Sequence, residues 1–176
     1  MREKIKTDTM ESMKRNVWIQ RFWKKIRRPL TFLPAVCLAC FIFGFSSQSG
    51  EESSSLSMQV TEILVRAADQ ITGAHWEEPE IQEKTEQYNI YVRKAAHMTE
   101  YALFAVALYI PLGGCGLRGR RRILMTLLIS AAFAAGDEWH QSFVGGRMPS
   151  PRDVGIDCAG AGIGTCAAWI FRRKQK

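Results

Sequence analysis

Four blocks of apolar residues alternate with strongly polar segments along the 176-residue chain. The blocks are residues 30–45, 101–112, 123–136 and 156–171. A helix that crosses a bilayer needs roughly 20 apolar residues, and each block is shorter than that. A block becomes long enough only if its helix continues outward through polar residues. The pattern therefore predicts an all-α polytopic membrane protein with four transmembrane helices that carry polar side chains near one end.

A further, amphipathic helix is predicted in the polar segment between the first two blocks. Between residues 53 and 71, apolar side chains recur at helical spacing, and charged or amide side chains lie opposite them. The serines at 53–55 are its candidate N-caps. We expect this outer helix to cap the bundle or to rest on the membrane, so that its apolar stripe is buried against the outer ends of the spans or in the interface. The stripe consists of Leu56, Val60, Ile63, Leu64, Ala67 and Ile71.

The distribution of charge predicts the orientation in the membrane. The chain has a net charge of +7, and its lysines and arginines gather before the first block, between the second and third, and after the fourth. Alternate loops are therefore basic, which is the pattern of cytoplasmic loops. Both termini are then expected in the cytoplasm, and residues 46–92 and 139–152 outside. This arrangement argues against nucleic acid as a partner and predicts contact of the basic tails with the anionic inner leaflet of the cell membrane.

The same pattern predicts the domain boundaries. We expect a basic cytoplasmic tail at residues 1–28, one membrane domain at residues 29–171 and a second basic tail at residues 172–176. A long basic stretch precedes the first apolar block, and no A-x-A-like cleavage site follows it. We therefore expect a retained membrane anchor there rather than a cleaved signal peptide.

Polar side chains reach a common depth on all four predicted spans. Counting about 1.5 Å per residue from the cytoplasmic end of each span, Glu100 lies about 18 Å up the second span. Asp137 and Asp157 each lie about 21 Å up the third and fourth spans, and Gln48 lies about 27 Å up the first. The hydrocarbon core is about 30 Å thick, so these groups lie in its outer half and below the surface.

Ionisable groups at that depth are costly unless they face one another or a water-filled pocket. Helical spacing places them on one face of each span: Arg93, His97 and Glu100 on the second, Asp137 and Gln141 with the adjacent His140 on the third, Asp153, Asp157, Gly160 and Gly164 on the fourth. A Gly-x-x-x-Gly face permits close helix packing, so the last face is expected to point into the bundle. A structural ion-pair network is one interpretation. A functional pocket is favoured, because the groups come from all four spans and include two histidines.

Three motifs carry these residues, together with the Phe-Ser-Ser-Gln stretch at residues 45–48. They are Arg93-Lys-x-x-His97-x-x-Glu100-Tyr101, Asp137-Glu-x-His-Gln141-x-Phe143-x-x-x-Arg147 and Asp153-x-x-x-Asp157-x-x-Gly160. At these motifs the chain resembles the VanZ-like family, named for a protein of a glycopeptide-resistance gene cluster and linked to teicoplanin resistance. The resemblance covers residues 30–171 and implies a membrane protein of the bacterial cell envelope. It supplies no reaction, and Asp157 stands where family members often carry asparagine.

Two functions remain open at this point. The first is an enzyme that acts on a lipid or lipid-linked envelope intermediate from the outer face. His97 or His140 would be the general base or acid, and Glu100 or Asp137 would orient it. Arg93, Arg147 and Arg152 would bind an anionic head group, and Gln48, Gln141, Asp153 and Asp157 would complete the ligand-binding site.

The second function is a non-catalytic protein whose pocket binds or shields a lipid head group or an amphiphilic antibiotic. A divalent metal bound by His97, Glu100, Asp137 and His140 is a weaker variant of the enzyme, because no H-E-x-x-H spacing is present. We therefore expect no cofactor. A transporter is disfavoured, because four spans are few and the sequence shows no inverted repeat.

Overall fold

The computed structural model describes residues 29–174, which form five helices and no strand. The helices are α2 (Leu33–Ser46), α3 (Gly50–Thr72), α4 (Glu78–Gly114), α5 (Gly119–Gln141) and α6 (Pro151–Lys174). The all-helical class predicted from the sequence is confirmed. The basic tail at residues 1–28, with its expected contact to the inner leaflet, lies outside the described residues.

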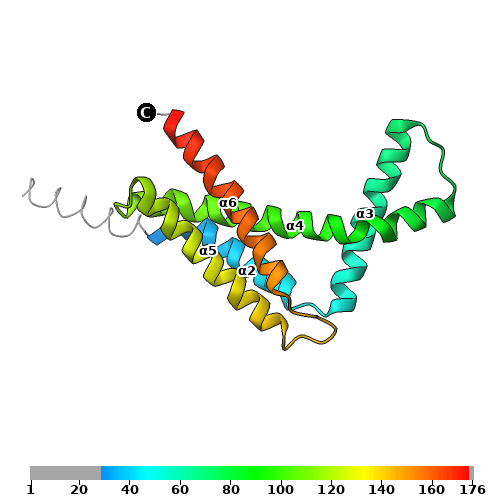
Figure 1. The fold of residues 1–176 in the computed structure, drawn as a ribbon, viewed down its shortest axis with the longest axis horizontal. Coiled ribbons are helices and arrows are strands. Elements are labelled where there is room, and N and C mark those ends of the chain that lie inside the picture. The colour runs from blue at the N-terminus through cyan, green and yellow to red at the C-terminus, as the bar shows by residue number, and fades with distance from the viewer. Residues whose placement is uncertain (1–28, 175–176) are drawn as a thin grey trace, which may run out of the picture.

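The longest helix, α4, organises the fold. Its 37 residues span about 56 Å, nearly twice the thickness of a hydrocarbon core. It packs against all four of the other helices. Figure 1 shows α2, α5 and α6 along its C-terminal half, whereas α3 crosses its N-terminal half. One half of α4 therefore belongs to a helix bundle, and the other half carries α3 away from that bundle.

The core of the bundle is a stripe of α4. Tyr101, Phe104, Leu108 and Leu112 recur at helical spacing and are all buried. They pack with Ala35 and Ile42 of α2 and with Ala134 of α5. The aromatic rings of Tyr101 and Phe104 also contact the ring of Phe133, at centroid distances of 6.0 and 4.9 Å. This core fixes α2 and α5 on one side of α4.

Two glycines of α6 hold the other side. A Cβ atom on Gly160 would collide with the backbone of Met98, and one on Gly164 with the backbone of Ala102. Met98 and Ala102 are four residues apart and lie on one face of α4. The expected close approach along the Gly160-x-x-x-Gly164 face is thus confirmed, and the partner is α4. This contact brings the N-terminal part of α6 beside the polar motif of α4.

Length and composition identify fewer spans than the sequence pattern predicted. Among the described residues, two helices, α4 and α6, are long and apolar enough to cross a membrane; α2 and α3 count as a third if a pair bent by 107° is one broken span. The helix α2 has only 14 residues, or about 21 Å, which is less than a hydrocarbon core. In α5, the uncharged stretch between Arg122 and Asp137 is shorter than a span, so a span must include charged residues at one end or the other. Its apolar part is therefore too short to count as a span by length and composition.

The predicted amphipathic helix is present as α3, but it begins earlier than expected. Its N-cap is Ser49, whose side chain accepts a hydrogen bond from the backbone of Glu52, while the Glu52 carboxylate accepts one from the backbone of Ser49. This capping box, rather than the serines at 53–55, starts the helix. The helix ends at Gly73, whose left-handed φ of 65° suits a glycine C-cap.

The packing face of α3 is not its apolar stripe. Thr61 and Val65 are the buried residues, and the Thr61 hydroxyl lies 3.4 Å from the side-chain oxygen of Asn89 on α4. Leu56, Val60 and Ile63 remain 43%, 51% and 67% exposed. Residues are spaced by about 100° around a helix, so the stripe lies roughly a third of a turn from the packing face. The expectation that the stripe is buried against the spans is wrong; burial in the membrane interface stays a prediction.

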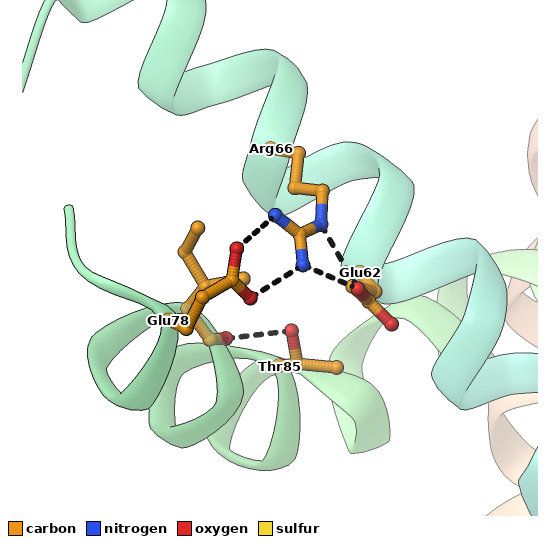
Figure 2. A network of polar contacts seen from close by, with 5 residues as sticks. Glu62, Arg66, Glu78 and Thr85 are labelled. Carbon is orange, nitrogen blue, oxygen red and sulfur yellow. Dashed lines mark hydrogen bonds and ion pairs between the residues drawn. The ribbon is translucent and has the colours of Figure 1, made fainter. Parts of the chain in front are cut away.

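Polar contacts close the turn between α3 and α4. The Arg66 guanidinium donates to Glu62, four residues earlier, and to both oxygens of Glu78 at 2.9 and 2.7 Å, as Figure 2 shows. Hydrogen bonding to Arg66 is the main cause that lowers the pKa of the Glu78 carboxyl below its usual range. Glu78 therefore keeps its charge, and its contact with Arg66, to a lower pH than an isolated glutamate. Because the three groups are exposed, they fix the geometry of the turn more than its stability.

Candidate functional site

The loop between α5 and α6 is tied to the end of α2 by Arg147. Its Nε donates to the carbonyl of Gln48 and its Nη2 to the carbonyl of Phe45, both at 3.2 Å. Carbonyls at the C-terminal end of a helix lack intrahelical partners, and a cation there also complements the helix dipole. Arg147 therefore joins two segments about a hundred residues apart in the sequence and places its guanidinium between α2 and α4.

Two further contacts fix the loop. The Gly50 amide at the start of α3 donates to the carbonyl of Gly145 at 3.0 Å, and any side chain at Gly50 would collide with Gly146. At the other end of the loop, the buried Glu138 carboxylate accepts a hydrogen bond of 2.6 Å from the Ser150 amide, next to the start of α6. The loop is thus held to α2, α3 and α5 at separate points.

These contacts surround a cavity of about 380 Å³. Its walls come from α4, the end of α5, the loop and the start of α6. Basic side chains, acidic side chains and one histidine share it. The lining residues with polar side chains are Arg93, Lys94, His97, Glu138, Gln141, Arg147, Ser150, Arg152, Asp153 and Asp157.

The cations of this cavity are not neutralised by close ion pairs. Within the described part of the chain, no carboxylate lies within 4.0 Å of the charged nitrogens of Arg93, Lys94, Arg147 or Arg152. One nitrogen of Arg147, Nη1, is buried and has no hydrogen-bond partner among the described residues. Cations in such a setting are satisfied by water or by an anionic ligand. The cavity therefore has spare capacity to bind an anion.

Asp137 lies behind the cavity rather than in its wall. It is 3% exposed and accepts a hydrogen bond of 3.3 Å from Gln141, which does line the cavity. It also interacts electrostatically with Arg147 and His140, and with Glu100 on the facing helix α4. Its Oδ1 has no hydrogen-bond partner among residues 29–174. Asp137 is thus placed to orient the cavity wall and to set its electric field.

The two histidines have different positions. His97 lines the cavity, and its Nδ1 lies 3.8 Å from a carboxylate oxygen of Glu100. That distance is too long for a hydrogen bond. The His140 ring instead contacts the tilted ring of Phe43 on α2, with ring centroids 4.3 Å apart, and it does not line the cavity. Of the two candidate acid–base groups, only His97 can therefore meet a ligand in the cavity.

The structure brings most of the predicted ligand-binding residues together. Arg93, Gln141, Arg147, Arg152, Asp153 and Asp157 line the cavity with His97. Gln48 and Glu100 lie in an adjoining groove. For the weaker metal variant, no group of three or more His, Cys, Asp or Glu side chains among the described residues is arranged to hold a metal ion.

Besides Ser150 of the loop, three residues with polar side chains in this region were not among the predicted site residues. Lys94 and Glu138 line the cavity, and Tyr101 is fully buried beside it. The Tyr101 hydroxyl interacts electrostatically with Asp137 and Asp157 and has no hydrogen-bond partner within the described region. Lys94, Glu138 and Tyr101 each directly follow a predicted residue in the sequence, and this adjacency could have indicated them; Ser150 has no such signal.

Comparison with known proteins agrees with the motifs. A family model described as VanZ/LLP1 matches residues 31–172. No curated protein and no solved structure matches the chain. The family match covers most of the chain and includes every residue that lines the cavity. The chain therefore belongs to the VanZ/LLP1 family of membrane proteins.

Proposed function

We propose that this protein binds the anionic head group of a lipid or lipid-linked envelope intermediate in the cavity, from the outer face of the cell membrane. The observation that carries the proposal is the set of four basic side chains that line one cavity without a close carboxylate partner. A phosphate accepts several charge-assisted hydrogen bonds from arginine and lysine, which fits this set. The link of the family to teicoplanin resistance is part of the same proposal, since protection could follow from altering or shielding such an intermediate.

Catalysis by His97 is the second candidate. Its imidazole lines the cavity with the basic side chains, so it could act as general base or acid on a bound phosphate or ester. The Glu100 carboxylate would approach from 3.8 Å to orient it. Turnover separates the two candidates: purified protein is incubated with a lipid-linked phosphate, and released head group is measured. Release by the native chain and its loss in His97→Gln would favour the enzyme.

The binding proposal is tested by retention of lipid in the purified full chain. We expect phosphatidic acid to be retained over phosphatidylcholine, and this selectivity to fall at least about tenfold in Arg93→Gln, because a hydrogen bond between charged groups is worth about 1.5–3 kcal/mol. Native mass spectrometry of protein from mixed-lipid nanodiscs gives both quantities. The matched control is Arg120→Gln, which removes the same charge from the exposed start of α5. Equal selectivity in the two variants would reject the proposal.

The proposed orientation has four spans, both termini inside and α3 outside. It is supported by a second cavity at the opposite end of the bundle, whose lining includes Arg118, Arg122, Arg172 and Arg173 beside the start of α2. The basic α4–α5 turn and the basic end of α6 therefore lie at the same end, as cytoplasmic segments do.

Cysteine labelling in intact cells tests this orientation. Cys115 is exposed in the α4–α5 turn, so it is a natural inner reporter, and Ser55→Cys on the exposed side of α3 is an outer one. Each cysteine is kept alone in an otherwise cysteine-free chain. We expect a membrane-impermeant maleimide to label position 55 in intact cells, and Cys115 only after permeabilisation. Labelling of Cys115 in intact cells would overturn the orientation.

A further inference from the structure

The polar cavity continues into a second space of different character. A groove of about 180 Å³ shares Arg93, His97 and Arg147 with the cavity. Its remaining wall is mostly apolar and also contains hydroxyl and amide groups and the Glu100 carboxyl group. These other lining residues are Phe45, Gln48, Ser53, Leu56, Ser57, Val60, Val92, Ala96 and Glu100. A charged space and an apolar space thus meet at two arginines and one histidine.

The groove lies between α3 and α4 and is open along its side. Phe45, Leu56 and Val60 form part of its wall and are 40%, 43% and 51% exposed, so no other described element covers them. The opening exists because α3 contacts α4 through Thr61 and Val65, and its apolar stripe is left free. Two stripe residues, Leu56 and Val60, are at once groove wall and exposed surface.

In the proposed orientation, the groove lies at the level of the outer leaflet. The helix α3 is bent by 107° from α2. It therefore lies roughly parallel to the membrane plane if α2 runs along the membrane normal. Its exposed stripe then faces lipid, and the groove opens toward the acyl chains of the outer leaflet. An occupant that reaches both spaces must carry an anionic group and an apolar chain. That combination describes a membrane lipid and excludes a free anion such as inorganic phosphate.

We propose that an anionic lipid enters sideways between α3 and α4, so that its head group reaches Arg93 and Arg147 while an acyl chain lies in the groove along Leu56 and Val60. This inference rests on the proposed function, because it uses the same arginines for the head group. It adds the route of entry and the position of the chain. It also explains why α3 keeps an apolar stripe that does not pack against the bundle.

Photochemical labelling tests the position of the chain. The full protein is placed in phosphatidylcholine nanodiscs that contain phosphatidic acid with a diazirine midway along one acyl chain, and labelled peptides are mapped by mass spectrometry. We expect labels at residues 53–60 and 92–96 to exceed several-fold those at Leu124 and Leu128, which are exposed on α5. Val60→Trp fills the groove and should reduce groove labelling to the α5 level. Ser55→Trp, an exposed change outside the groove on the same helix, should leave it unchanged.

The outcomes separate this inference from the proposed function. Groove labelling no stronger than that of α5, or insensitive to Val60→Trp, overturns the sideways route even if Arg93→Gln still abolishes selectivity for phosphatidic acid. A phosphatidylcholine probe with the same diazirine tests whether the groove binds acyl chains regardless of their head group. If it labels the groove as strongly as the phosphatidic acid probe, the groove binds chains without head-group selection. That result leaves the groove as a chain site and overturns the inference that joins it to the head-group site, whereas the proposed function is still decided by the lipid selectivity of the native chain and of Arg93→Gln.

Discussion

Replacing Gly160 with alanine is expected to push α6 away from α4 and to destabilise the whole bundle. The added Cβ would collide with the backbone of Met98, and backbone cannot turn aside as a flexible side chain can. Inserting atoms into a packed interface commonly costs about 1–3 kcal/mol, and a backbone obstacle places this change at or above the upper end. Thermal unfolding of the detergent-solubilised full chain measures the effect. Gly164→Ala, which meets the backbone of Ala102, should behave in the same way.

The matched control for these two variants is Gly162→Ala. No described atom outside its own helix lies within 4 Å of the position that its Cβ would occupy. Alanine is about 1 kcal/mol better than glycine in a helix interior, so this variant should be neutral or slightly stabilised. The two changes are chemically identical and two residues apart, and they are expected to have opposite signs. Equal unfolding temperatures for Gly160→Ala and Gly162→Ala would contradict the tight crossing.

A lost crossing would also affect the site. The contact of Gly160 with Met98 sets α6 beside the part of α4 that carries His97, and Asp157 lies one turn before Gly160 on α6. The glycines therefore act on the cavity from a distance, through the position of the helix. A loss of lipid selectivity in Gly160→Ala accompanied by lower stability would not identify Gly160 as a ligand-binding residue.

The sequence predicted the helices better than their packing partners. Each of the four apolar blocks coincides largely with one helix, because apolar runs and helix breakers depend on local chemistry, but α4 begins at Glu78, far before its block. The start of α3 was misplaced because several serines offered caps, and only the pairing of Ser49 with Glu52 selects one. The stripe of α3 predicted an apolar environment. In a membrane protein, lipid and protein both supply that environment, so the stripe could not reveal its neighbour.

The sequence could predict the height of the site residues along their helices and the helix face that carries them. It could not predict which neighbour each side chain meets. The shared height of Glu100, Asp137 and Asp157 along their helices needs only the helix rise. Whether His140 meets the cavity or Phe43 depends on the rotation of α5 about its axis, which the core around Ala134 decides. The contact of Arg147 with the end of α2 joins distant segments and has no local signature.

Asp137→Asn is expected to remove function while the fold is kept. Asparagine has nearly the shape of aspartate and can still accept the hydrogen bond from Gln141, so the wall of the cavity keeps its partner. What disappears is a negative charge that lies close to Glu100 on one side and Arg147 on the other. Asp137→Ala removes the acceptor as well and leaves Gln141 without it, which should cost about 1–3 kcal/mol of stability in addition.

The effect of Asp137→Asn is measured as the teicoplanin susceptibility of cells that carry the variant, with the protein level determined in the same cells. If the native chain protects cells, Asp137→Asn at equal level should restore the susceptibility of cells that lack the protein. Glu83→Gln makes the same kind of change on the exposed N-terminal part of α4 and should protect as the native chain does. Full protection by well-expressed Asp137→Asn would show that the charge is dispensable. Loss of protection only together with loss of protein would instead identify Asp137 as part of a structural network, and the proposed site would then rest on the basic side chains alone.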